Sequence, residues 1–268
     1  MNDKSQTKSG GLPAAAKGDA IYAIGDIHGR YDLWKQMIEI IERHAAIYRR
    51  GESYHIIVLG DMIDRGPDSA RVIRSLRALS GQKKATVLLG NHEDAMLRTL
   101  DGEPGMLTRW MRFGGDATLQ SFGITPPGDE NDYPRVMQQM RDDIPENYVS
   151  WLRRRPISVR SGDYLFCHAG IRPGVEINRQ KTEDMLWIRD EFLESDEAHG
   201  VVVVHGHSIS PDVELRHNRI GIDTGAYRTG VLTAAFLSDT VCHILSTEDD
   251  VGPASASTSR KSRAPELQ

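Results

Sequence analysis

Three short stretches decide the fold of this chain: GDIHGR at residues 25–30, GDMIDRG at residues 60–66 and GNHE at residues 90–93. They follow apolar runs of strand length, which read IYAI, HIIVL and TVLL. Each stretch therefore puts its polar side chains just beyond the carboxyl end of a buried strand, which is where open α/β sheets build their sites. The pattern predicts an α/β protein whose functional residues follow its strands.

The side chains in these stretches are of the kinds that bind metal ions. Asp26 and His28 stand two apart at a turning strand end, so both can point at one ion. Asp61 can lend one carboxylate oxygen to each of two ions, and Asn91 supplies a neutral carbonyl oxygen. Oxygen and nitrogen ligands without a thiolate suit divalent ions of borderline hardness, such as Mn or Fe, with Zn, Ni, Co and Mg as alternatives. We expect two divalent ions, with Mn as the first choice.

Two later histidines extend the cluster. LFCHAG places His168 after an apolar strand, and VVVVHGHS places His207 after another. A single His or Asp is usually an exposed or hydrogen-bonded residue. Three Gly-Asp or Gly-Asn strand ends in order, followed by two histidines after strands, are difficult to explain by packing alone. Because polar residues at loop ends are the expected carriers of function, we interpret the five stretches as one site.

These motifs resemble those of the phosphoprotein phosphatase family of calcineurin-like metallophosphoesterases, whose blocks read GDxHG, GDxxDRG and GNHE, followed by single histidines. The resemblance covers residues 21–245, in short islands. It implies an α/β/β/α sandwich of two facing mixed sheets flanked by helices, with a dinuclear metal site that hydrolyses phosphoesters. Carried over position by position, it implies these metal ligands: Asp26, His28 and Asp61 for one ion, and Asp61, Asn91, His168 and His207 for the other.

The resemblance also implies four residues that act on the substrate. His92 corresponds to the general acid and Asp64 to the carboxylate that orients it. Arg65 corresponds to a phosphate-binding guanidinium, and a second one maps to Arg189 in MLWIRDEF, where the motif is looser. The two ions would neutralise phosphate charge and make hydroxide available for in-line attack without a covalent enzyme intermediate. Protonation of the leaving alkoxide by His92 would contribute about 10² to 10⁴ in rate.

Three other catalytic motifs are almost, but not completely, present in the sequence. CHAGIR at residues 167–172 has four residues between Cys and Arg, one fewer than the loop of a cysteine phosphatase, so Cys167 is interpreted as a small buried residue. GHSIS at residues 206–210 lacks the final Gly of a nucleophile elbow. HEDAM at residues 92–96 lacks the second His of a zinc protease helix, and the sequence has no phosphate-binding loop of the GxxxxGKS or GxxxxGKT type.

Composition fits one soluble domain. The chain has 268 residues, and its net charge of -5 gives no electrostatic footprint for nucleic acid, so no nucleic acid binding is expected. Two cysteines, Cys167 and Cys242, lie in apolar runs and favour a reducing compartment over a disulfide framework. No apolar run approaches membrane-spanning length, and the N-terminus has no apolar signal segment. We therefore expect a cytoplasmic protein with no membrane partner, and no pattern in the sequence indicates an oligomeric state.

The domain is predicted at residues 19–246. Residues 1–18 are rich in Lys, Ser and Gly, and the tail from residue 247 contains GPASASTSRKSRAPELQ, so both ends are predicted to be disordered. Residues 101–163 change to helical and loop material and are predicted to form a helical insertion beside the site. Alternating strands and helices before it indicate βαβ units. The predicted strands are 21–26, 55–60, 86–89, 164–167, 201–204, 220–223, 231–237 and 240–245.

Fold and motif leave the substrate open. Arg30 stands where eukaryotic protein phosphatases usually have Gln. The short chain resembles the small bacterial and phage members, which include serine/threonine protein phosphatases and symmetrical dinucleoside tetraphosphatases. We favour phosphoserine and phosphothreonine in proteins as substrates over dinucleoside polyphosphates or other small phosphoesters. A dinucleoside needs platforms on which its two bases stack, and only 6% of residues are aromatic. In the insertion, the residues that could supply platforms are Trp110, Phe113, Tyr133, Tyr148 and Trp151.

A function of another class is a non-catalytic scaffold that binds phosphoproteins and keeps the metals. The presence of His92 disfavours it, because a general acid has no use in binding alone. The sequence therefore predicts a metal-dependent phosphoric ester hydrolase of the serine/threonine protein phosphatase type.

Overall fold

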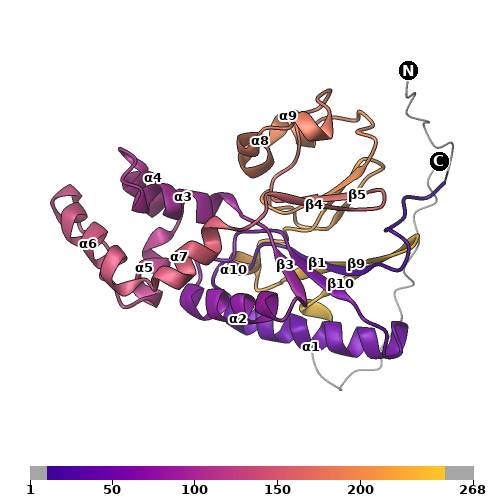
Figure 1. The fold of residues 1–268 in the computed structure, drawn as a ribbon, viewed down its shortest axis with the longest axis horizontal. Helices are drawn as coiled ribbons and strands as arrows, with labels where there is room; N and C mark the ends of the chain where they lie inside the picture. The colour runs from indigo at the N-terminus through magenta and orange to yellow at the C-terminus, as the bar shows by residue number, and fades with distance from the viewer. Residues whose placement is uncertain (1–10, 251–268) are drawn as a thin grey trace.

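The computed structural model describes residues 11–250, whose strands form two sheets (Figure 1). The first sheet has the strand order β10-β9-β1-β2-β3. Strands β1, β2 and β3 are parallel, whereas β9 is antiparallel to both β1 and β10. The bounds of its strands are β1 Ala20–Ile24, β2 His55–Val58, β3 Ala85–Val87, β9 Thr233–Ser238 and β10 Val241–Ser246.

The second sheet has the strand order β4-β5-β6-β8-β7 and is also mixed. Strands β5, β6 and β8 are parallel, and the edge strands β4 and β7 each run antiparallel to their neighbour. The bounds of its strands are β4 Ser158–Ser161, β5 Tyr164–Cys167, β6 Val202–His205, β7 Glu214–Leu215 and β8 Arg219–Gly221.

The two sheets pack face to face through alternate residues of their strands. Ile21 and Ala23 of β1 point into the space between the sheets, where they join a core with Phe166 and Val204 of the second sheet. Tyr22 and its neighbours on the other face of β1 join a separate core under the helices. Successive strand residues point to opposite faces, so one apolar strand serves both cores.

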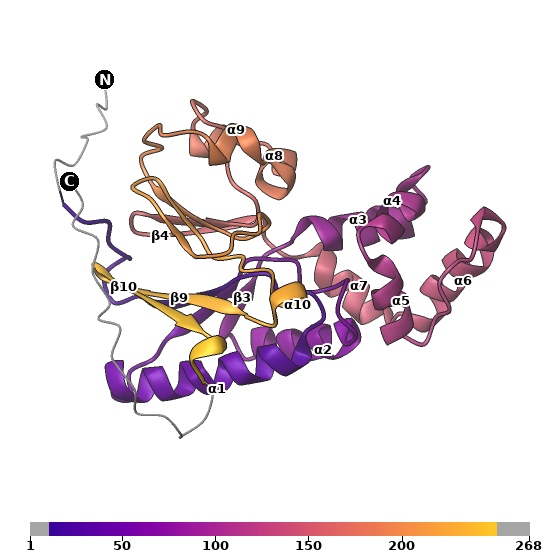
Figure 2. The same ribbon diagram turned by 180° about the vertical axis from the view of Figure 1, so that it is seen from behind.

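Helices cover the outer face of each sheet. Under the first sheet lie α1 (Tyr31–Tyr48) and α2 (Ser69–Gly81), which contribute Trp34 and Ile73 among others to its outer core (Figures 1 and 2). Over the second sheet lie α8 (Thr182–Trp187) and α9 (Asp190–Leu193), and Phe192 packs there with strand residues of β5 and β6. The α/β/β/α order predicted from the sequence is confirmed.

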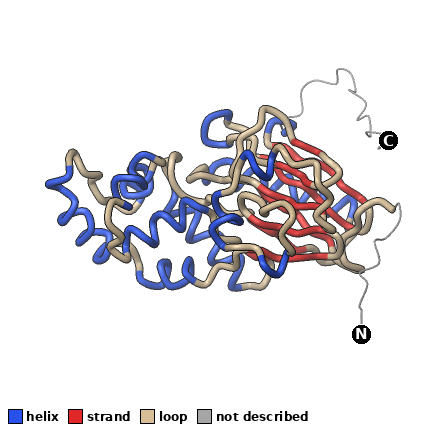
Figure 3. Tube along the Cα trace, turned by 90° about the horizontal axis from the view of Figure 1, so that it is seen from above, coloured by secondary structure: helices blue, strands red, loops and turns tan. Residues whose placement is uncertain are grey.

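A group of helices lies beyond one end of the sheets (Figures 1 and 3). Trp110 and Leu152 are completely buried and belong to the core that α1 and α2 share with these helices. Strand β4 begins at Ser158 and pairs with β5, so the helical part ends before residue 158 and not at residue 163. The helices are α3 Asn91–Leu100, α4 Met106–Arg112, α5 Gly115–Ser121, α6 Tyr133–Asp143 and α7 Glu146–Arg153.

The predicted disordered ends differ from the structure at their inner boundaries. Residues 11–18 are described, and the backbone N–H of Ala15 donates to the carbonyl of Asp239. Thr247 is buried and exchanges hydrogen bonds with Leu232. Backbone partners hold both segments, which a composition argument does not detect. The remaining residues of the predicted ends, 1–10 and 251–268, lie outside the described range. Within residues 11–250, no helix combines the length and the apolar character needed to cross a membrane.

Candidate metal centre

The predicted strand ends meet at one edge of the two sheets. Because β1, β2 and β3 are parallel in one sheet and β5 and β6 are parallel in the other, their carboxyl ends can converge. The six side chains predicted as ligands follow these five strands, and all are buried, with exposed fractions of 6% or less. They are Asp26 and His28 after β1, Asp61 after β2, Asn91 after β3, His168 after β5 and His207 after β6.

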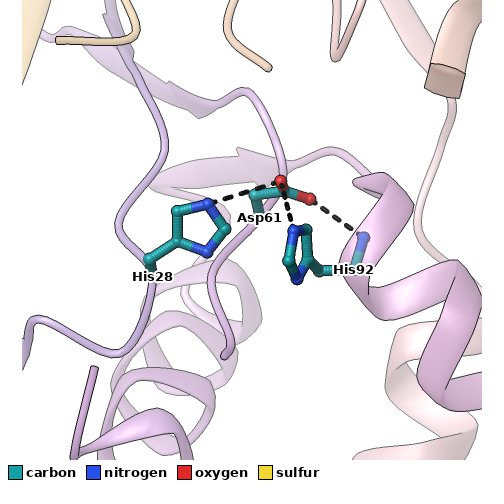
Figure 4. Close-up of side chains that lie close together, drawn as sticks. All are labelled: His28, Asp61 and His92. Atoms are coloured by element: carbon teal, nitrogen blue, oxygen red, sulfur yellow. Dashed lines mark hydrogen bonds and ion pairs between the residues drawn. The ribbon is translucent and has the colours of Figure 1, made fainter. Parts of the chain in front are cut away.

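Asp61 stands between two groups of side chains that could each hold a metal ion. His28, Asp61 and His92 form one group, and Asp61, His168 and His207 form the other. The Oδ2 atom of Asp61 lies 3.6 Å from Nε2 of His28 (Figure 4). Its Oδ1 atom lies 3.3 Å from Nε2 of His168. The carboxylate therefore presents one oxygen to each group, which is the arrangement that a bridging ligand needs.

The histidines are held in the form that binds metals. Nδ1 of His28 donates to the carbonyl of Ile63 at 2.8 Å, and Nδ1 of His168 donates to the carbonyl of Leu59 at 2.9 Å. These bonds leave the Nε2 lone pairs directed into the centre, as in other metal sites. Burial lowers the pKa of His28 well below its usual value and that of His207 to about 2. Neutral imidazoles are the ligand form, so the rings are ready to bind cations.

The carboxylate of Asp26 has too little positive charge around it. Burial, together with the nearby charges of Asp223 and Asp61, raises the pKa of Asp26 well above its usual value. The backbone N–H of His207 donates to Asp26 at 3.1 Å but does not neutralise it. Bound divalent cations would satisfy these oxygens and the neutral rings at once. The donor set therefore fits two such ions.

His92 and Asp64 form a buried pair beside the ligands. Nδ1 of His92 lies 2.6 Å from Oδ2 of Asp64, and Nε2 of His92 lies 3.7 Å from Asp61. Asp64 also accepts bonds from Nε1 of Trp110 at 2.9 Å and from Oγ1 of Thr118 at 2.6 Å. Burial alone would lower the pKa of His92, but the carboxylates of Asp61 and Asp64 outweigh it and raise that pKa. The ring is thus disposed to keep a proton near neutral pH.

The two predicted arginines lie near different ligands of the cluster. Nη1 of Arg65 lies 3.1 Å from Nε2 of His28, and its guanidinium stacks 4.5 Å from the ring centre of Tyr227. Arg189 is exposed. The pKa of His207 is lowered first by burial and next by His168. The positive charge of Arg189 also lowers it, so Arg189 lies near that ligand. Sequence reasoning missed Tyr227, although it follows directly on the IDTGA stretch.

Comparison with known proteins fits this geometry. A family model described as calcineurin-like phosphoesterase matches residues 20–234, which is most of the chain.

The chain belongs to the calcineurin-like phosphoesterases.

Relatives of this phosphoesterase carry related names. A symmetrical bis(5'-nucleosyl)-tetraphosphatase of Methylococcus capsulatus is 31% identical over 155 residues, which cover 58% of this chain and 44% of that protein. One from Legionella pneumophila is 30% identical, with 66% and 53% covered. The chain spans about half the length of these curated relatives.

A solved structure named provisionally as a diadenosine tetraphosphatase superimposes with a TM-score of 0.58 at 18% identity and covers 88% of this chain and 98% of its own. At that identity it shows a shared fold.

Strained backbone is concentrated in the centre of this calcineurin-like phosphoesterase. Eight residues other than glycine have positive φ in the described range, and five of them are predicted site residues. Each such conformation costs of order 1–3 kcal/mol and persists only where surrounding structure enforces it. Strain of this kind typically marks functional sites. The five are His28, Asp61, Asp64, Arg65 and His207.

Glu93 is the residue that enforces part of this backbone, and sequence reasoning gave it no role. Its carboxylate accepts the N–H groups of Gly90, Asp61, Met62 and Ile63 at 2.9–3.1 Å. It therefore ties the loop that carries Asp61 to the loop that carries Asn91. The GNHE motif itself could have pointed to it, because its last letter is an acid next to the ligands.

Cys167 is buried, as expected from the sequence. Its thiol contacts the carbonyl of Gly170, and burial raises its pKa to about 12. A thiolate nucleophile would need a lowered pKa. The chemistry of cysteine phosphatases is therefore unsuited to this residue.

Replacing Gly206 by Ala is expected to weaken metal binding about 10- to 100-fold, the range seen when groups that orient metal ligands are disturbed. An added Cβ at Gly206 would lie 2.1 Å from Oδ1 of Asp26 and would displace that carboxylate. Titration calorimetry with Mn²⁺ measures the change. Gly81→Ala is the matched control, since no atom lies within 4 Å of its Cβ position. Equal Mn²⁺ affinity in the two variants would contradict the placement of Asp26 in the centre.

Proposed function

We propose that this calcineurin-like phosphoesterase hydrolyses dinucleoside tetraphosphates symmetrically, giving two nucleoside diphosphates. The observation that carries the hydrolytic part is the buried Asp61, whose two oxygens face two separate groups of histidines. The substrate class is supported by the relatives in Methylococcus capsulatus and Legionella pneumophila, which are named as symmetrical tetraphosphatases.

The proposed ligands fall into two sets that share Asp61. Nε2 of His28 and Nε2 of His168 face this carboxylate, and Nδ1 of His207 lies 2.9 Å from Oδ1 of Asn91. When bound, the cations neutralise phosphate charge and provide hydroxide near neutral pH. We assign Asp26, His28 and Asp61 to one cation and Asp61, Asn91, His168 and His207 to the other. Mn²⁺ is our first choice, on the basis of the mixed oxygen and nitrogen donors.

His92 is proposed as the general acid. Its Nδ1 is held by Asp64, so its Nε2 faces the centre and can give a proton to the leaving oxygen. Trp110 and Thr118 hold Asp64 in turn, which fixes the orientation of the pair. Arg65 and Arg189 would bind the phosphate oxygens with their planar guanidinium groups. A binding scaffold would gain nothing from a buried acid with this support.

Hydrolysis of phosphoserine and phosphothreonine peptides, which the sequence favoured, stays a prediction. It shares every proposed residue with tetraphosphate hydrolysis, because the difference lies in the leaving group and not in the attacked phosphate. Fold cannot separate the two substrates. We rank the tetraphosphate first on the names of the relatives that share at least 30% identity.

A single panel tests the proposal. The Mn²⁺-loaded protein is assayed with diadenosine tetraphosphate, a phosphoserine peptide and p-nitrophenyl phosphate, and nucleotide products are separated by ion exchange. We expect ADP alone from diadenosine tetraphosphate, with kcat/KM at least about tenfold above that for the peptide. AMP with ATP would show asymmetrical cleavage. A reversed ratio would favour the protein phosphatase, and no turnover of any substrate would favour the scaffold.

A further inference from the structure

Two partly exposed aromatic rings continue outward from the acid His92. The ring of Phe113, which follows α4, has its centre 5.8 Å from that of His92. The ring of Trp187, at the end of α8, has its centre 5.8 Å from that of Phe113, with an angle of 50° between the planes. The two residues come from elements in different parts of the fold (Figure 1). They form a continuous aromatic surface, which we call the aromatic platform.

Charged side chains of both signs adjoin the aromatic platform, and one of them, Arg189, has no ion-pair partner in the described range 11–250. Trp187 lines a surface pocket of about 520 Å³ that also contains the basic residues Arg172, Lys181 and Arg189 and the acidic residues Glu183, Asp184, Asp190 and Glu191. Arg172 is committed to ion pairs with Asp184 and Glu191. Arg189, in contrast, forms no ion pair with another residue in the described range 11–250. Its guanidinium is therefore available to an anionic ligand beside the exposed ring.

We propose that Phe113 and Trp187 bind the purine base of the leaving nucleotide by stacking. The inference rests on the proposed function, in which His92 protonates the leaving oxygen, so a surface that continues from His92 contacts the leaving group. Aromatic faces next to a free guanidinium suit a purine nucleotide, whose base stacks while its phosphates bind the cation. The platform determines specificity and takes no part in proton transfer.

The aromatic platform also corrects the argument from low aromatic content. Of the residues named in the predicted insertion, Phe113 packs its ring against that of His92 and stays partly exposed, whereas Trp110 and Trp151 are buried in the helical core. The second ring, Trp187, comes from the segment that contains Arg189, outside the insertion. Two rings suffice for one base, so a small aromatic fraction does not exclude a nucleotide.

Tryptophan fluorescence reports on the platform directly. The chain has four tryptophans, and Trp34, Trp110 and Trp151 are buried with exposed fractions of 6% or less, so Trp187 is the one that a ligand can reach. Titrating the Mg²⁺-loaded protein with ADP is expected to quench fluorescence in the wild type and in Trp34→Phe but not in Trp187→Leu. Inorganic pyrophosphate, which has no base, should not quench. Equal quenching by ADP in Trp187→Leu would overturn the proposal.

Kinetics separates base binding from a structural role. In Phe113→Leu and in Trp187→Leu, the ratio of kcat/KM for diadenosine tetraphosphate to kcat/KM for inorganic tetraphosphate should fall by about 5- to 150-fold, the value of one stacked base. An unchanged ratio would overturn the proposal that the platform binds a base, whether the two kcat/KM values fall together or neither falls. If the wild type hydrolyses no dinucleotide, the proposed function fails, while the ADP titration still decides whether the platform binds a base.

Discussion

Asp61→Asn is expected to reduce hydrolysis by at least about 10³-fold, because it removes several kcal/mol of metal-based charge stabilisation. The amide keeps the shape of the side chain but loses the negative charge that faces both ligand groups. The hydrogen bond from the backbone N–H of residue 61 to Glu93 is not affected by the substitution. Removing the charge relieves repulsion with Asp26 but gives up the attraction of His168, His92 and His28, which outweighs burial and holds the pKa of Asp61 well below its usual value. Because these two effects oppose each other and the shape of the side chain is kept, the metal-free variant should stay folded.

Metal content separates this expectation from simple misfolding. After loading with Mn²⁺ and desalting, elemental analysis should find two ions per wild-type chain and fewer in Asp61→Asn, with similar thermal unfolding of the metal-free forms. Asp32→Asn is the matched control, since its side chain is 60% exposed and pairs only with Arg30 in the described structure. Undiminished wild-type activity after exhaustive chelation would sink the two-metal hypothesis.

The strands that support the centre could be predicted because their apolar runs are unambiguous. YLFC at β5 has the bounds 164–167 in both the prediction and the structure. β1 and β2 begin within one residue of their predicted starts. Both end two residues earlier than predicted, because the chain must leave the ladder to turn into the site. Asp61, at positive φ, is one such turning residue.

The two edge strands of the second sheet, β4 and β7, could not be predicted from the sequence. β4 reads SVRS and β7 reads EL, and neither has the apolar run that identified the other strands. Their stability comes from pairing with a neighbour: Ser158 lies opposite Cys167, and Leu215 lies opposite Ile220. Strand formation at an edge depends on the partner more than on local composition. A polar strand of this kind is therefore invisible until the sheet beside it is known.

The contacts that orient the candidate acid were hidden for a related reason. Trp110 and Thr118 lie 46 and 54 residues from Asp64 in the chain, in a segment without motifs. Trp110 was expected either to pack the helices or to contact the substrate; its ring packs in the helical core while its Nε1 reaches the carboxylate. Buried tryptophans usually find a partner for this N–H, but the partner is chosen by the fold. The insertion thus contributes to the site through helices whose own sequences carry no catalytic pattern.

His92→Asn is expected to lower kcat on an alkyl phosphate by about 10² to 10⁴, the usual contribution of a general acid. The loss should be smaller on p-nitrophenyl phosphate and smallest on diadenosine tetraphosphate, because phenolate and nucleoside diphosphate leave without full protonation. Asp61 should keep its place, since the bond to its Oδ1 comes from the backbone N–H of residue 92 and survives the substitution. Measured metal content should therefore remain at the wild-type level.

The test is whether the three losses follow this order. It is made by measuring kcat for all three substrates with the same Mn²⁺-loaded preparation. A His92 that only positions ligands would, when replaced, slow all substrates by the same factor, and that result would contradict the acid role. His217→Asn is the matched control, because His217 is exposed and bonds only to the carbonyl of Asp196 in the described structure. Cleavage of an anhydride needs a general acid least, and cleavage of an alkyl ester needs it most. A buried His92–Asp64 pair therefore makes ester hydrolysis chemically accessible to this site as well. The wild-type rate on a phosphoserine peptide, compared with its own His92→Asn value, therefore measures how much ester chemistry this phosphoesterase has kept.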